Sequence, residues 1–251
     1  MALKFVNMTR EEFLSKTLLH KFMSLENALD SLNNKRLWFA NPTTWKDPFE
    51  KRFIEATYKD NNGQTSDFAW KGRVFCICMT ETSTSEAYWN AYSQQSIGIE
   101  LKFRRDNLLK ELEKLAQKYN VFIGKVEYMK TSEITKKLSS IPFNPPCKIN
   151  IRTQECKARL LLLKRSAYIY EDEIRIIIVK DKKSNERGIY LNYEHDNADI
   201  IHSITLDPSI GINIEALLKN IFEKEYGFRP KKYKVQKSLL YSELKPVSIE
   251  I

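Results

Sequence analysis

The segment AYIYEDEIRIII, residues 167–178, places two carboxylates and a guanidinium where chemistry can occur. Glu171 and Glu173 are two residues apart at the predicted start of a strand, so we expect them to share a face while Asp172 points away. Arg175 shares that face and could orient one carboxylate through a bidentate pair. Paired carboxylates can stabilise an oxocarbenium-like sugar cation, as in glycosyl transfer. The alternative interpretation is an ion-paired edge strand.

A second candidate segment, RLWFANPTTWKDPFE, covers residues 36–50. It combines tryptophans and phenylalanines with three polar candidates for ligand binding, Asn41, Asp47 and Glu50. Aromatic rings beside fixed carboxylates suit a flat polar ligand, because the rings stack and the carboxylates accept hydrogen bonds. For Trp38 and Phe39 we favour a place in the core. Asp47, followed by a proline, fits a turn-capping role at least as well as ligand binding.

A third candidate is Glu81, which follows the apolar run RVFCICM at residues 73–79. Loops at strand ends are where polar ligands meet a scaffold, so Glu81 is a candidate site residue. Trp89 and Tyr92 are three residues apart on a predicted helix and lie on one face of it. Core packing is the commoner explanation for such a pair.

The elements that would position these residues alternate irregularly along the chain. Apolar periodicity predicts strands at 18–22, 36–40, 73–79, 96–103, 121–129, 173–179, 189–193 and 200–206, with another near Tyr233. Helices are predicted after the N-cap Ser24, over SEAYWNAYSQ and at 106–119, 153–166 and 212–225. This order predicts an α+β fold with a mixed, mostly antiparallel sheet and flanking helices.

No Gly/Ser-rich linker divides the chain, so we expect a single domain over residues 1–251. Three prolines interrupt the stretch at 139–150, which therefore reads as a loop. Since long loops inside domains are often functional, we expect this one to be a flap.

Composition excludes several classes of function. The 251 residues include only 7 glycines, and neither a GxGxxG nor a GxxxxGK[ST] motif is present. The four cysteines and three histidines fit neither a disulfide framework nor a zinc site, so we expect no metal. No apolar run approaches a membrane span, and the N-terminus does not resemble a secretory signal. We therefore expect a cytoplasmic protein without a membrane partner.

The net charge of +9 is unevenly distributed. The region from Lys102 to Arg165 holds 16 lysines and arginines against 6 acidic residues, a net charge of +10. A basic half beside a neutral half suggests a polyanionic partner such as nucleic acid. The alternative is a lysine-rich solvated surface, since lysine outnumbers the geometrically more specific arginine.

The candidate segments resemble, in order, the motifs of a bacterial and phage-associated family known as domain of unknown function 2971. The likeness rests on His20-Lys21-Phe22, LWFANP at 37–42, DPFE at 47–50, Thr80-Glu81, Trp89, Tyr92, Gly98-Ile99-Glu100 and YEDEIRI at 170–176. It runs from about residue 18 to residue 206. This chain departs from the family pattern at Ala40, Lys46 and Ile174, where serine, asparagine and tryptophan are usual.

A weaker resemblance points to ADP-ribosyltransferases, which share a polar residue on an early strand, an aromatic-rich second motif and a late E-x-E. This resemblance implies NAD as the co-substrate. Either His20 or Lys21 would touch the NAD ribose, Glu173 would support the cationic transition state and Glu171 would orient the acceptor. The residues expected to surround NAD are Lys21, Asn41, Asp47, Glu50, Glu81, Tyr170 and Arg175.

Two hypotheses follow. The first is an NAD-consuming ADP-ribosyltransferase, such as a toxin or phage-defence effector, with a basic surface for nucleic acid. The second is a non-enzymatic module that binds or senses nucleic acid. The first hypothesis predicts that Glu173, His20 and the 41–50 loop meet in one cleft, with Arg175 lowering the pKa of Glu173.

Overall fold

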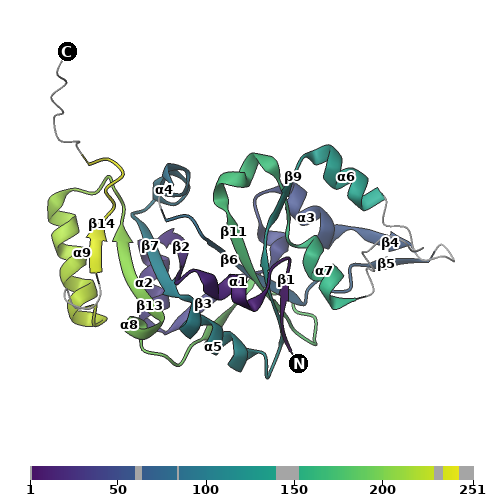
Figure 1. The fold of residues 1–251 in the computed structure, drawn as a ribbon, viewed down its shortest axis with the longest axis horizontal. Coiled ribbons are helices and arrows are strands. Elements are labelled where there is room, and N and C mark those ends of the chain that lie inside the picture. The colour runs from purple at the N-terminus through teal and green to yellow at the C-terminus, as the bar shows by residue number, and fades with distance from the viewer. Residues whose placement is uncertain (1, 60–63, 84, 140–152, 229–233, 243–251) are drawn as a thin grey trace, which may run out of the picture.

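The computed structural model describes residues 2–59, 64–83, 85–139, 153–228 and 234–242, and its centre is a sheet of ten strands (Figure 1). Eight strands follow one another in the order β1-β8-β11-β6-β2-β7-β13-β14, and β3 joins β6 to β12 at the side. Their bounds are β1 Leu3–Val6, β2 Leu18–Ser24, β3 Arg36–Ala40, β6 Val74–Thr80, β7 Gly98–Arg104, β8 Asn120–Lys125, β11 Glu173–Val179, β12 Gly188–Asn192, β13 Ile201–Leu206 and β14 Lys234–Lys237. Only the pairs β1–β8 and β13–β14 are parallel in this sheet. The predicted α+β class with a mostly antiparallel sheet is confirmed.

Helices cover both faces of this sheet, and two short two-stranded sheets lie beside it. The α-helices are α1 Arg10–Ser15, α2 Leu25–Asn33, α3 Pro48–Glu55, α4 Glu86–Ser93, α5 Arg105–Leu115, α6 Thr131–Ser139, α7 Gln154–Leu160, α8 Asn197–Ile200 and α9 Ile212–Glu225. The 3₁₀ helices are η1 Pro42–Thr44 and η2 Ser166–Glu171. The small sheets pair β4 Thr57–Lys59 with β5 Thr65–Asp67, and β9 Glu127–Met129 with β10 Leu163–Arg165.

Strand β11 separates two hydrophobic cores, because its alternate residues point to opposite faces of the sheet. Ile174, Ile176 and Ile178 belong to the core that α2, α5 and α9 cover. Ile177 and Val179 belong to the second core, which α3 and α7 cover. Every residue of β11 is buried, so Glu173 and Arg175 are buried charges at one end of the second core.

Long periodic segments match their predicted elements closely: β3, β11 and α9 have the expected bounds. The helix predicted over 153–166 is wrong in its second half. It ends at Leu160, and β10 follows at Leu163–Arg165. The leucines at 160–163 are all buried, and the Leu161 carbonyl, at the C-cap of α7, accepts a hydrogen bond from Arg175 Nη1 at 2.7 Å.

The stretch predicted as a loop after β3 is more ordered than expected. It contains η1 and the start of α3, where Asp47 is the N-cap and Pro48 occupies the first turn. The proposed flap at 139–150 lies outside the described residues, except for Ser139 at the end of α6. Among the helices that the structure describes, none is long and apolar enough to cross a membrane.

Candidate active site

A cavity of about 670 Å³ lies beside β6, where two neighbouring strands diverge. Strand β6 pairs with β11 along its whole length. On its other side it pairs once with β2, at Thr80 and His20, and once with β3, at Cys76 and Ala40. Residues of β2, β3 and β6 line the cavity together with residues of α2, α3, β10, η2 and β11. Its volume is typical of a small-molecule site.

Glu173 and Glu50 share one buried guanidinium, that of Arg175, in the wall of this cavity. Arg175 Nε and Nη2 both donate to Glu173 Oε2, at 3.0 and 2.7 Å, and Nη2 also donates to Glu50. The Arg175 guanidinium lies over the Trp45 ring, 4.5 Å from its centroid. Burial alone would raise the pKa of Glu173, but the charges of Arg175 and Lys164 outweigh it and hold that pKa below its usual value.

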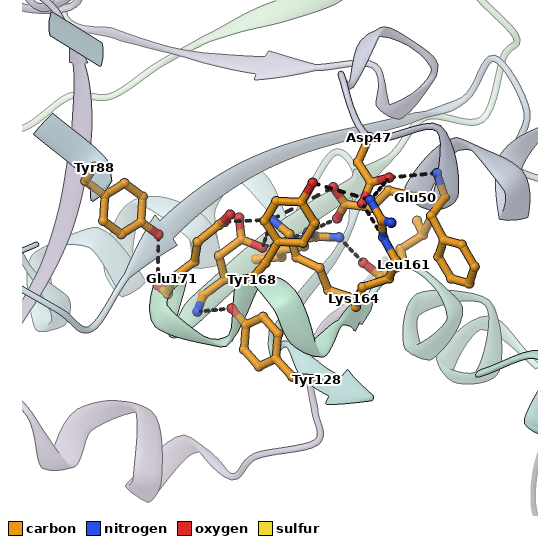
Figure 2. Close-up of polar contacts among 12 residues, drawn as sticks. Asp47, Glu50, Tyr88, Tyr128, Leu161, Lys164, Tyr168 and Glu171 are labelled. Atoms are coloured by element: carbon orange, nitrogen blue, oxygen red, sulfur yellow. Dashed lines mark hydrogen bonds and ion pairs between the residues drawn. The ribbon is translucent and has the colours of Figure 1, made fainter. Parts of the chain in front are cut away.

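Lys164, on β10, is the second cation of the cluster and was not among the predicted site residues. Its ammonium lies 2.6 Å from Glu171 Oε2, 3.5 Å from Glu173 Oε2 and 3.8 Å from Glu50 Oε2 (Figure 2). The negative charges around it raise its pKa despite burial, so it stays protonated. The contacts from Arg175 and the closest approach of Lys164 all reach Oε2 of Glu173.

Glu171 titrates near neutrality. Burial first, and then the adjacent Glu173 charge, raise the pKa of Glu171 to about 7, although Lys164 opposes the shift. The two carboxyl groups are close enough to hydrogen-bond, so one proton can be shared between them. The E-x-E therefore contains one carboxyl group whose pKa is lowered beside another whose pKa is about 7, so the pair can take up or release a proton at neutral pH.

The backbone of this E-x-E differs from the expected strand. Glu171 ends η2, and Asp172 has the left-handed conformation (φ 39°, ψ 54°), which is strained for a non-glycine residue. The Glu171 carbonyl accepts hydrogen bonds from the hydroxyls of Tyr88, at 2.8 Å, and Thr80, at 2.6 Å. The Glu173 N–H donates to the Tyr128 hydroxyl at 3.0 Å. These contacts come from three elements, α4, β6 and β9, and they fix the turn that carries both carboxyl groups; Figure 2 shows the contacts of Tyr88 and Tyr128.

The 41–50 loop contributes unequally to the cavity. Asp47 and Glu50 line it. Asp47 also caps α3 by accepting from the Phe49 N–H, and it pairs with Arg165 at 2.9 Å, so the predicted capping role is confirmed. Asn41 is buried and caps η1, and its amide donates to the Glu186 carbonyl. It is not among the lining residues, so its position supports the fold of the loop.

Of the two alternatives on β2, the structure brings Lys21 to the cavity. Lys21 is a lining residue, whereas His20 is buried next to Thr80 and its Nδ1 lies 2.7 Å from Glu100 Oε1. Glu173 and the 41–50 loop therefore line one cavity, as predicted, with Asp47 and Glu50 as the loop's acidic lining residues. His20 does not line the cavity, although its neighbour Lys21 does. At about 4.8 Å per strand, the register still places His20 roughly 10 Å from Glu173 across the sheet.

Of the two remaining predicted site residues, Tyr170 lies at the cavity and Glu81 does not. Tyr170 is half-exposed and lines the cavity together with Tyr168. Glu81 belongs to a different cluster, in which Arg105 binds it at 2.6 Å, Lys125 at 2.9 Å and Lys16 at 3.0 Å. These cations outweigh the effect of burial and lower the pKa of Glu81 to about 2. Glu81 therefore fastens α5 and β8 together rather than facing a ligand.

The basic region from Lys102 to Arg165 does not form one continuous element. It spans β7, α5, β8, β9, α6, α7 and β10. Several of its cations are bound by acidic residues: Arg105 by Glu81, Lys164 by the E-x-E, and Lys114 by Glu111 and Glu194. Part of the excess charge is thus consumed inside the fold. Among the described residues, no group of histidine, cysteine and acidic side chains is placed to hold a metal ion.

Comparison with known proteins confirms the family resemblance in part of the chain. Residues 88–176 match the family model described as a protein of unknown function (DUF2971). The match contains most of α4, Lys164 and the E-x-E, and it is shorter than the stretch of shared motifs at 18–206. No curated protein matches the chain.

Among solved structures, the chain is similar to DarT of Thermus sp. 2.9. The complex with carba-NAD⁺ is 11% identical, with 88% of this chain and 94% of that chain covered and a TM-score of 0.35. The complex with ADP-ribosylated single-stranded DNA is 10% identical, with 89% and 93% covered and a TM-score of 0.37.

Proposed function

We propose that this protein transfers ADP-ribose from NAD to an acceptor at the cavity beside β6. One observation carries the proposal: an ionised Glu173 in the cavity wall lies against Glu171, whose pKa is about 7. A fixed negative charge stabilises a sugar cation as it forms, and a neighbouring group with a near-neutral pKa can accept a proton. The resemblance to ADP-ribosyltransferases assigned the same two roles to these residues.

The reaction follows from the two carboxyl groups. The bond between ribose C1′ and the nicotinamide nitrogen breaks, and its electron pair leaves with neutral nicotinamide. Glu173 stabilises the resulting oxocarbenium-like cation. The acceptor then attacks C1′, and its proton passes to the Glu171 carboxylate. Arg175 and Lys164 bind Glu173 at Oε2 and lower its pKa, which keeps this carboxylate charged as the cation forms.

We propose nucleic acid as the acceptor. The chain carries a net charge of +9, which attracts polyanions through counterion release. The alternative, a module that only binds nucleic acid, would not require a buried E-x-E at a cavity of this size, because its contacts would lie on an exposed basic face. Several cations of the basic region, among them Arg105 and Lys164, are instead paired with acidic residues inside the fold.

Labelled NAD tests the reaction and the acceptor together. Incubation with DNA, RNA or protein should release nicotinamide and transfer label to nucleic acid. Expression of an active enzyme should then slow cell growth, as expected of a toxin or phage-defence effector, and Glu173→Gln should relieve this effect. Mobility-shift titrations at two salt concentrations test the alternative: binding that weakens steeply with salt, without any NAD cleavage, would favour the non-enzymatic module.

A further inference from the structure

An aromatic pair that the proposed reaction does not use lies at the β3–β12 side of the same cavity. Trp38 and Tyr190 face each other across β3 and β12, with ring centroids 4.7 Å apart. Both line the cavity, and they are 42% and 45% exposed. Contact across the strands explains why the two residues pair. It does not explain why two large rings remain half-exposed at the wall of the cavity that holds Glu173.

The rings are supported from behind. A Cβ atom at Gly188 would lie only 2.2 Å from Trp38 Cζ2, so the glycine lets the indole lie against the β12 backbone. On the other side, the Arg36 guanidinium lies 3.6 Å from the Tyr190 centroid and is itself held by Asp30 at 2.6 Å. A rigid, half-exposed aromatic surface is suited to stacking against a flat ring.

Two lysines line the cavity along with this pair. Lys21 comes from β2, and Lys46 precedes α3. Neither ammonium forms an ion pair with any residue that the structure describes. Unpaired cations in a cavity suit phosphate oxygens, because they gain charge-assisted hydrogen bonds without giving up an existing partner.

We propose that the Trp38–Tyr190 pair binds the adenine base of NAD, and that Lys21 and Lys46 bind its diphosphate. This inference rests on the proposed function and deepens it. A dinucleotide with its nicotinamide ribose at Glu173 has a second flat base and two phosphates to accommodate. The cavity offers an aromatic surface and two cations for these groups. At two strand spacings of about 4.8 Å, β3 lies roughly 10 Å from β11 across β6, so one extended ligand can reach both.

The test measures ligand affinity by calorimetry in the Glu173→Gln background, where NAD is not consumed. Trp38→Ala should weaken ADP-ribose binding by roughly 10-fold or more, the loss expected for one stacked base. Nicotinamide mononucleotide lacks adenine, so its affinity for the Trp38→Ala variant should stay within twofold of its affinity for Glu173→Gln alone. Trp38→Phe should restore most of the ADP-ribose affinity. Gly188→Ala should mimic Trp38→Ala, because its Cβ displaces the indole.

Three results would overturn the inference: equal loss of affinity for both ligands, no loss for either, or a loss confined to a short oligonucleotide. The last result would assign the aromatic pair to a base of the acceptor. Thermal unfolding of each variant identifies any that fails to fold. If Gly188→Ala does not fold, the comparison of Trp38→Ala with Trp38→Phe still decides the test. If Trp38 governs ADP-ribose binding while the wild type leaves NAD intact, the proposed function fails and the base site stands.

Discussion

Glu50 on α3 and Glu173 on β11 bind the same guanidinium, that of Arg175. Two segments more than a hundred residues apart in the chain therefore meet in one buried cluster, which Lys164 completes from β10. With three carboxylates and two cations, the cluster carries one net negative charge when Glu171 is ionised and none when it is protonated. Because the pKa of Glu171 is about 7, this charge changes within the physiological range.

The first prediction concerns pH. If Glu171 accepts the proton of the acceptor, transfer should require its ionised form, so the rate should rise with pH through a midpoint near 7. Glu171→Gln should be slow and should lack this rise. The pH–rate profile, together with a carboxyl ¹³C titration of Glu171, measures both quantities. A wild-type rate that stays flat between pH 5.5 and pH 8.5, which are values about 1.5 units either side of that pKa, would show that Glu171 is not the base.

The second prediction concerns Lys164. Replacement by methionine removes the cation that opposes the raised pKa of Glu171, so the midpoint of the pH–rate profile should move clearly above 7. Breaking a buried ion pair should also lower the free energy of unfolding by about 3 kcal/mol. Lys164→Arg keeps the charge and serves as the matched control. An unchanged midpoint in Lys164→Met would contradict this account of the cluster.

The third prediction separates Glu81 from the active site. Its low pKa, about 2, means that its ion pairs stabilise the fold above its usual pKa of 4.5 and that this stabilisation is lost as the pH falls towards 2. Glu81→Gln should therefore unfold at a lower temperature than the wild type at pH 7, and the difference should vanish near pH 2. Its KM for NAD should not change. A raised KM with normal stability would place Glu81 at the ligand instead.

The sequence predicted those parts of the fold whose signals are local. Strand β11 and helix α9 were found because their apolar periodicity is long and uninterrupted. Helix α3 was missed although Asp47-Pro48 is a recognisable helix start, since the aromatic residues around it were interpreted as a loop. The E-x-E and the DPFE block were correctly placed at one cavity. Both carry charged residues within apolar sequence, and such residues are expected to gather at a shared site because a core does not accommodate them singly.

The residues that were missed depend on long-range pairing. Lys164 was placed on a basic helix, and only the buried leucines before it signalled that its side chain points inward. Trp38 was expected in the core together with Phe39, but only Phe39 is buried there. The exposure of Trp38 follows from its pairing with Tyr190, and from Gly188 beneath its ring, neither of which local sequence reveals. Tyr88 and Tyr128 likewise reach the E-x-E from separate elements.

The central claim is that Glu173 supports cleavage of NAD, and the rate of nicotinamide release by Glu173→Gln tests it most directly. We expect a loss of roughly 100-fold or more with NAD still bound, because the variant keeps the shape of the side chain and removes its charge. Glu155→Gln, which removes only an exposed ion pair with Lys4, is the matched control and should cleave NAD at the wild-type rate. Wild-type activity in Glu173→Gln would contradict the account.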